Sequence, residues 1–125
     1  MTERKETEME VAFGQLRACV PERDAEGGFD EEAQIDKIKG EYEEMREAYR
    51  DWVHTGGGKE EAKLLEEAVD TMTALATLLW AHTSGDRVNG ERILQTIKMV
   101  NLKNGLRGYH DFEEEGEKSE EESRA

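Results

Sequence analysis

Two pairs of carboxylates are spaced so that each pair would lie on one side of a helix: Glu41 with Glu44, and Glu67 with Asp70. Residues three apart are neighbours on a helix surface. If the two helices pack together, the four carboxylates converge. Like charges at that distance repel unless cations neutralise them, and clustered carboxylate oxygens suit Mg²⁺ or Mn²⁺. The spacing therefore suggests a divalent-metal site.

The alternative to a metal site is a solvated acidic face. Glu is so common in this chain that pairs three residues apart arise by chance on any of its helices. Glu43, Glu47 and Asp51, for example, are expected to face water with Arg46 and Arg50 paired along the same helix. Spacing alone leaves both interpretations open.

The charge of the chain restricts its partners. Its 125 residues are enough for one small domain, and they carry 31 acidic against 17 basic side chains, for a net charge of -14. We expect no direct partnership with nucleic acids or anionic membranes, because both require positive charge.

The longest uncharged run, residues 71–85, is too short for a membrane helix, which needs about 20 residues. The N-terminus lacks a signal-peptide pattern, so a cytoplasmic protein is expected.

The abundance of helix-favouring residues, with proline and glycines at the breaks, predicts an all-α chain. The expected helices cover about residues 6–19, 31–54, 59–82 and 89–104. The lone cysteine, Cys19, is expected to pack inside the first helix. The second helix carries the clearest periodicity, an apolar stripe with spacings of three and four: Ile35, Ile38, Tyr42, Met45, Tyr49 and Trp52. On the third, an apolar face is predicted at Leu65, Val69, Met72, Ala76 and Leu79.

The third helix also predicts an assembly. From Thr71 to Ala81 no side chain is charged on any face, and such a helix must be covered all round. The other helices are short and acidic, so we expect a second copy to supply the cover, in a homodimer or a dimer of dimers. By contrast, Glu113 to Ala125 has seven acids, two bases and no apolar residue except the last, which predicts a disordered tail after a single domain over residues 1–112.

Taken together, the motifs resemble a known family. Glu41-x-x-Glu44-x-x-x-Ala48, followed by Glu67-x-x-Asp70 at the head of an uncharged helix, is similar to the ExxE and ExxD signature of the MazG-like, all-α nucleoside triphosphate pyrophosphohydrolases. The segment KMVNLKNGLRGYH, residues 98–110, resembles the Asn- and Lys-rich close of small single-domain members, including phage-encoded ones. The resemblance covers about residues 35–110.

The resemblance implies a four-helix fold completed by dimerisation and a Mg²⁺-dependent reaction. Glu41, Glu44, Glu67 and Asp70 would hold magnesium, and water would attack the α-phosphorus of a nucleoside triphosphate to release a nucleoside monophosphate and pyrophosphate. Glu41 or Glu44 would also act as the catalytic general base, and the sequence does not say which.

Groups that would contact the rest of the nucleotide are less distinct. The fourth helix and its end carry the only cluster of basic and amide side chains near a helix terminus, and phosphate oxygens need such donors: Lys98, Asn101, Lys103, Asn104 and Arg107. Alternatively, these side chains merely complement the helix dipole. Trp52 and Trp80, with Tyr49, are candidates for stacking on a base, although aromatic residues at helical spacing also serve as core.

Other functions fit the same pattern. The fold also resembles the dimeric dUTPases and phosphoribosyl-ATP pyrophosphohydrolase; the helix after Asp70 lacks the tyrosine-histidine pair expected of the latter. Outside enzymes, the chain would be a non-catalytic helical dimer that acts as an acidic interaction module. Pyrophosphate release with and without magnesium separates these possibilities.

Overall fold

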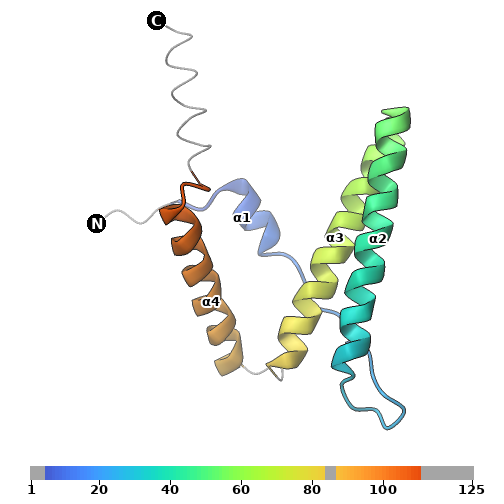
Figure 1. Ribbon diagram of the computed structural model, residues 1–125. Helices are drawn as coiled ribbons and strands as arrows, with labels where there is room; N and C mark the ends of the chain where they lie inside the picture. The colour runs from blue at the N-terminus through green and yellow to red at the C-terminus, as the bar shows by residue number, and fades with distance from the viewer. Residues whose placement is uncertain (1–4, 84–86, 111–125) are drawn as a thin grey trace, which may run out of the picture. The chain divides into compact units, whose positions relative to one another are not determined.

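The computed structural model describes residues 5–83 and 87–110 (Figure 1). The all-α prediction is confirmed, since these residues contain four helices and no strand beyond one isolated bridge. They form two compact units that are each described by themselves, the first holding three helices and the second one. The predicted tail, residues 113–125, lies outside the described residues. The helices are α1 (Glu8–Phe13), α2 (Glu31–Thr55), α3 (Gly58–His82) and α4 (Arg87–Leu106).

The boundaries of α2 follow from its end residues. Asp30 is the N-cap, and its Oδ1 accepts a hydrogen bond of 3.0 Å from the backbone N–H of Ala33. This confirms the predicted start. The helix ends at Gly56, whose φ of 64° places it in the left-handed region that side chains avoid. Its N–H donates to the carbonyl of Trp52, which satisfies one of the last helical carbonyls.

Helices α2 and α3 form an antiparallel hairpin, named here the α2–α3 hairpin (Figure 1). Within the described residues of the first unit, it is the only pair of helices that packs together. Only Gly56 and Gly57 separate the two helices, so the chain reverses direction within a short turn and the helices lie antiparallel. At the other end of the hairpin, His82 Nδ1 pairs with the carboxylate of Glu31.

The first helix is much shorter than predicted. It stops at Phe13, with Gly14 as its C-cap, rather than continuing to Cys19. Glycine weakens the helix at that point, and the residue before Pro21 is biased towards extended backbone. Cys19 therefore lies exposed in a loop, and the expectation that it packs inside a helix is wrong.

Only half of the predicted apolar stripe of α2 lies towards α3, since Ile38, Met45 and Trp52 are partly buried. The buried residues of α2 are Gln34 and Ala48, which lie one position before Ile35 and Tyr49 of the stripe. Tyr49 remains 53% exposed and Ile35 51% exposed. A shift of one residue turns the contact face by about 100°, so that half of the stripe faces away from α3.

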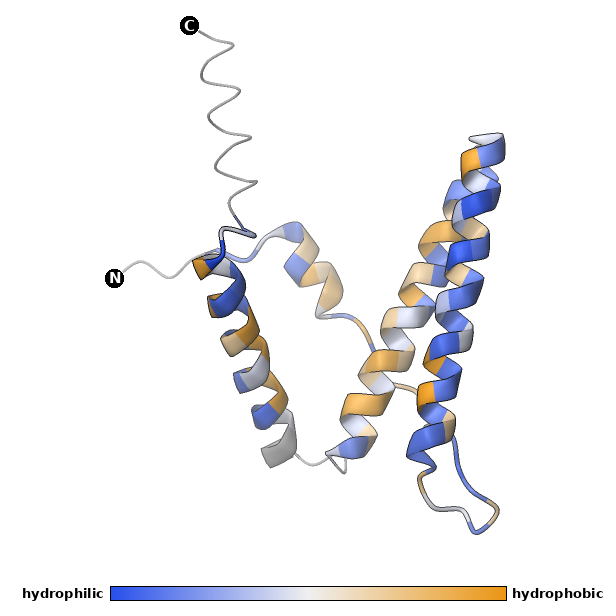
Figure 2. Cartoon of the chain, in the orientation of Figure 1, coloured by the Kyte–Doolittle hydropathy of each residue, from blue (hydrophilic) through white to orange (hydrophobic). Residues whose placement is uncertain are grey.

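On α3 too, the buried residues are not members of the predicted face. They are Glu67, Ala74 and Thr77. Leu65, Val69 and Leu79 of that face are largely exposed. Figure 2 shows α2 as mostly hydrophilic and the C-terminal half of α3 as mostly hydrophobic. The described hairpin thus buries small and polar residues most deeply between its helices, and several of its large apolar side chains lie outside.

Candidate metal centre

The register of the hairpin is fixed by a buried amide. Gln34, 1% exposed, donates from Nε2 to the main-chain carbonyl of Ala74 at 3.1 Å. Two helical turns further along α2, at position 34 + 7, lies Glu41; two turns back along α3, at 74 − 7, lies Glu67. Because the helices are antiparallel and a heptad returns to nearly the same face, this register sets Glu41 against Glu67.

Three of the four predicted carboxylates converge. One carboxylate oxygen from each of Glu41, Glu67 and Asp70 can be chosen so that all lie within 4.8 Å of one another. Oxygens on opposite sides of a magnesium ion are about 4.2 Å apart, because each Mg–O distance is about 2.1 Å. The three carboxylates could therefore hold a divalent cation if their side chains closed in slightly around it. We call Glu41, Glu67 and Asp70 the acid cluster.

Glu67 is the buried member of the acid cluster, with only 6% of its surface exposed. Its Oε1 accepts a salt bridge of 2.8 Å from Lys63 Nζ, one turn earlier on α3. Its Oε2 is buried and has no hydrogen-bond partner among the described residues. Buried carboxylate oxygens are rarely left unpaired, because the loss of water is not compensated. A cation near this oxygen would supply that compensation.

Glu44, the fourth predicted carboxylate, lies at the exposed edge of the acid cluster. Its pKa is raised above the ordinary value, chiefly by the negative charge of Glu41 and then by that of Glu67. Loss of hydration and the hydrogen bond that a protonated Glu44 makes to Glu67 act in the same direction, whereas Lys63 lowers the pKa. When both carboxylates are ionised, Glu44 has no proton to offer, so this hydrogen bond is lost. Helix α2 continues through Gly40 without a break, which keeps Glu41 and Glu44 in helical register.

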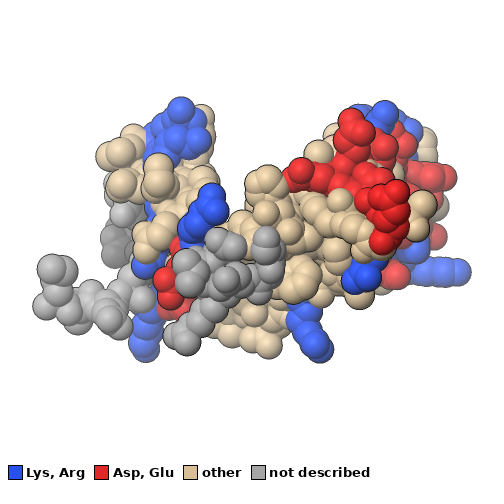
Figure 3. Space-filling view, turned by 90° about the horizontal axis from the view of Figure 1, so that it is seen from below, with Lys and Arg blue, Asp and Glu red and all other residues tan. Residues whose placement is uncertain are grey.

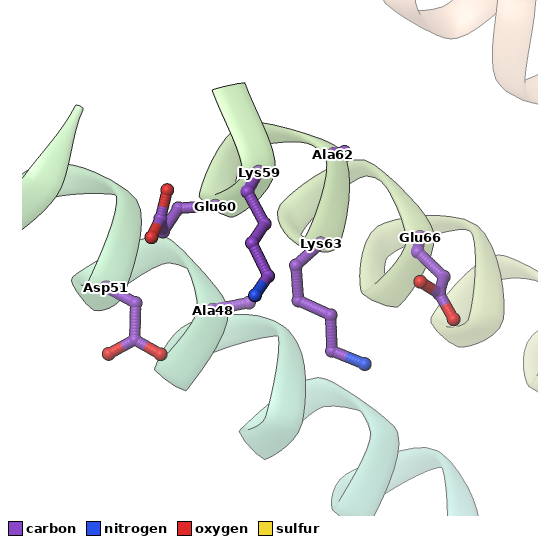
Figure 4. Close-up of a pocket in the computed structure, with 7 residues that line it drawn as sticks. All are labelled: Ala48, Asp51, Lys59, Glu60, Ala62, Lys63 and Glu66. Carbon is purple, nitrogen blue, oxygen red and sulfur yellow. The ribbon is translucent and has the colours of Figure 1, made fainter. Parts of the chain in front are cut away.

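Two open cavities border this region. One, of about 200 Å³, is walled by Glu41 and Asp70, by Lys37 and Thr73, and by Cys19 and its neighbours in the loop before α2. The other, of about 400 Å³, is lined by Ala48, Asp51, Lys59, Glu60, Ala62, Lys63 and Glu66 (Figure 4). Acidic side chains gather over the hairpin in the view of Figure 3.

A buried polar patch holds the loop wall in place. Gln34 Oε1 accepts a hydrogen bond of 3.0 Å from the N–H of Glu22, and Thr77 Oγ1 accepts one of 2.9 Å from the N–H of Cys19. Thr77 also donates to the carbonyl of Thr73. We call Gln34 and Thr77 the polar clamp. It ties the segment from Cys19 to Glu22 to both helices of the hairpin.

The predicted phosphate-binding residues lie on a separate unit. Lys98, Asn101, Lys103 and Asn104 belong to α4, and Arg107 follows its end, where its N–H donates to the carbonyl of Lys103. Of these, Asn104 is partly buried and the others are exposed. The acid cluster belongs to the first unit, so the structure neither joins nor separates the two groups.

The two tryptophans do not form one pocket within a chain. Trp52 lies near the turn of the hairpin, where it contacts Tyr49 with ring centroids 6.1 Å apart. Trp80 lies near the end of α3, 24 residues beyond Gly56, which is roughly 36 Å along a helix. A pocket that uses both residues would require two chains.

Sequence reasoning missed Lys63 and the polar clamp. Lys63 had a recognisable signal, because it stands four residues before Glu67 on the same helix. Gln34 and Thr77 had none, since a polar residue within a helix normally faces water.

Comparison of the chain with family models, with curated proteins and with solved structures found no match. None of the helices within the described ranges combines the length and apolar character that crossing a bilayer requires.

Proposed function

We propose that this protein is a magnesium-dependent nucleoside triphosphate pyrophosphohydrolase. The observation that carries the proposal is buried Glu67, whose Oε2 is unpaired and whose carboxylate contributes an oxygen within 4.8 Å of oxygens of Glu41 and Asp70. A solvated acidic face would not bury a carboxylate and leave one of its oxygens without a partner. The reaction itself comes from the MazG-like resemblance of the two motifs.

The roles of the carboxylates follow from their placement. Glu41, Glu67 and Asp70 would hold Mg²⁺ or Mn²⁺, which supplies a Lewis acid and a water of lowered pKa. Glu44 stands outside this set, and its raised pKa brings it nearer to that of a group that exchanges a proton at neutral pH. We therefore assign the general base to Glu44 and metal ligation mainly to the other three.

A second copy of the chain belongs to the proposal. Leu75, Leu79 and Trp80 lie in the uncharged part of α3 and are each between 44% and 49% exposed. Tyr42 and Tyr49 on α2 are similarly open. A homodimer or dimer of dimers that covers these faces would bury them and let tryptophans from two chains approach one nucleotide. Light scattering at micromolar concentration should give at least a dimer, and Leu79→Glu should break it or unfold the chain.

The test of the function is pyrophosphate release from a panel of canonical and modified nucleotides, with and without magnesium. We expect release from at least one nucleoside triphosphate only when magnesium or manganese is present. Cleavage restricted to dUTP, or to phosphoribosyl-ATP, would instead select one of the related pyrophosphohydrolases. If no nucleotide is cleaved and magnesium does not bind, the acidic interaction module becomes the better description.

A further inference from the structure

Lys63 is a cation already present at the acid cluster. Its ammonium lies 2.8 Å from Glu67 Oε1, so one oxygen of the buried carboxylate is occupied and the other is not. The Lys63 side chain is 57% exposed, whereas that of Glu67 is 8% exposed. The lysine is thus accessible to solvent, whereas the carboxylate is enclosed.

The charges around Lys63 hold the ammonium in place. Its salt bridge joins it to Glu67, and the nearby carboxylates of Glu66 and Asp70 also attract its charge. In the absence of metal, Lys63 therefore reduces the repulsion within the acid cluster. Its positive charge compensates the buried carboxylate of Glu67, whose burial would otherwise be energetically costly.

We propose that Lys63 is an internal counter-ion that competes with the divalent metal for Glu67, so that the protein remains folded without metal and binds metal more weakly than its carboxylates alone would. This inference rests on the proposed metal site. A divalent ion at Oε2 lies one carboxylate away from the ammonium at Oε1, and the two positive charges repel each other. Metal entry displaces Lys63 towards the 400 Å³ cavity that its side chain lines (Figure 4).

Lys59 provides a matched control. It lies one turn before Lys63 on α3, is exposed and lines the same cavity. Figure 4 shows both lysine side chains reaching from α3 towards α2. The structure shows a salt bridge to Glu67 from Lys63 and none from Lys59 among the described residues. Replacing either lysine by methionine removes one charge and keeps the length of the side chain, so the two variants differ in that salt bridge.

The experiment measures Mn²⁺ binding to the full chain at pH 8 and low salt, by calorimetry or by electron paramagnetic resonance. We expect Lys63→Met to bind Mn²⁺ roughly tenfold more tightly than wild type, since one positive charge beside the ion is removed. Lys59→Met should change the affinity much less, and Lys63→Arg should keep it near wild type. Without metal, Lys63→Met should melt at a lower temperature than wild type, and saturating Mg²⁺ should remove most of that difference.

A measurement on wild type keeps the inference testable if Lys63→Met does not fold. On addition of Mg²⁺, the NMR signal of the Lys63 side chain should shift strongly while that of Lys59 does not. Equal or weaker Mn²⁺ binding by folded Lys63→Met, or an unmoved Lys63 signal in metal-saturated wild type, would overturn the inference. Absence of Mn²⁺ binding by wild type would instead refute the metal site itself.

Discussion

The interface between α2 and α3 contains two polar regions, which differ in whether their buried polar atoms have hydrogen-bond partners. In the polar clamp, both polar atoms of the Gln34 amide are hydrogen-bonded and the hydroxyl of Thr77 both accepts and donates. In the acid cluster, two helical turns away, Glu67 Oε2 is buried without a partner.

The two regions differ in whether their polar groups satisfy one another. Neutral groups that satisfy each other fix a register and need nothing further. Carboxylates that face each other destabilise the same interface until a cation arrives. The clamp therefore sets where the acid cluster lies, and we propose that the cluster binds a divalent cation.

The largest expected effect comes from Asp70→Asn, which removes one charge from the acid cluster and keeps the shape. We expect magnesium-dependent hydrolysis to fall by about a hundredfold or more, because a metal ligand is weakened. The metal-free protein should melt at a slightly higher temperature, because Asp70 no longer repels Glu41 and Glu67.

These opposite signs distinguish a lost site from a damaged fold, which would lower both activity and melting temperature. Asp36→Asn on the exposed surface of α2 is the matched control and should change neither quantity by much. If Asp70→Asn and Asp36→Asn behave alike in magnesium titrations and pyrophosphate release, the acid cluster is a solvated face.

An intermediate effect is expected at the clamp. Gln34→Met keeps most of the volume but removes the acceptor for the N–H of Glu22 and the donor to Ala74. The free energy of unfolding should fall by about 1–3 kcal/mol, the cost of leaving a buried polar group unpaired. Urea denaturation measures this loss. Unlike Asp70→Asn, the variant should still gain stability from magnesium; failure to do so would show that the clamp and the acid cluster are not separable.

The smallest expected effect is a pH dependence that arises from Glu44. Its pKa in the folded protein is raised above 4.5, the ordinary value, so the stabilisation of its protonated form is fully present below pH 4.5. That contribution is lost as the pH rises through the folded-state pKa. In EDTA, the melting temperature of Glu44→Gln minus that of wild type should therefore increase as the pH is raised from 4 to 7. A difference that stays constant would mean that Glu44 is not coupled to the acid cluster.

Much of this arrangement was readable in the sequence. Asp30 and the glycines at the turn determined where α2 begins and ends and where α3 begins, and the predicted helices contain Glu41, Glu67 and Asp70 as expected. These are local properties, since a cap or a turn depends on residues within a few positions. The failure at Cys19 was also local: Gly14 and Pro21 shortened the first helix.

Only the tertiary structure decided which faces meet. The stripe of large apolar residues on α2 was visible in the sequence, yet the most deeply buried positions belong to Gln34 and Ala48, since small and hydrogen-bonded side chains let two helices approach closely. That register also buried Glu67 and left its Oε2 unpaired. Spacing fixes which residues share a face of one helix, whereas burial and pairing depend on a second helix distant in sequence, and no local pattern carries that information.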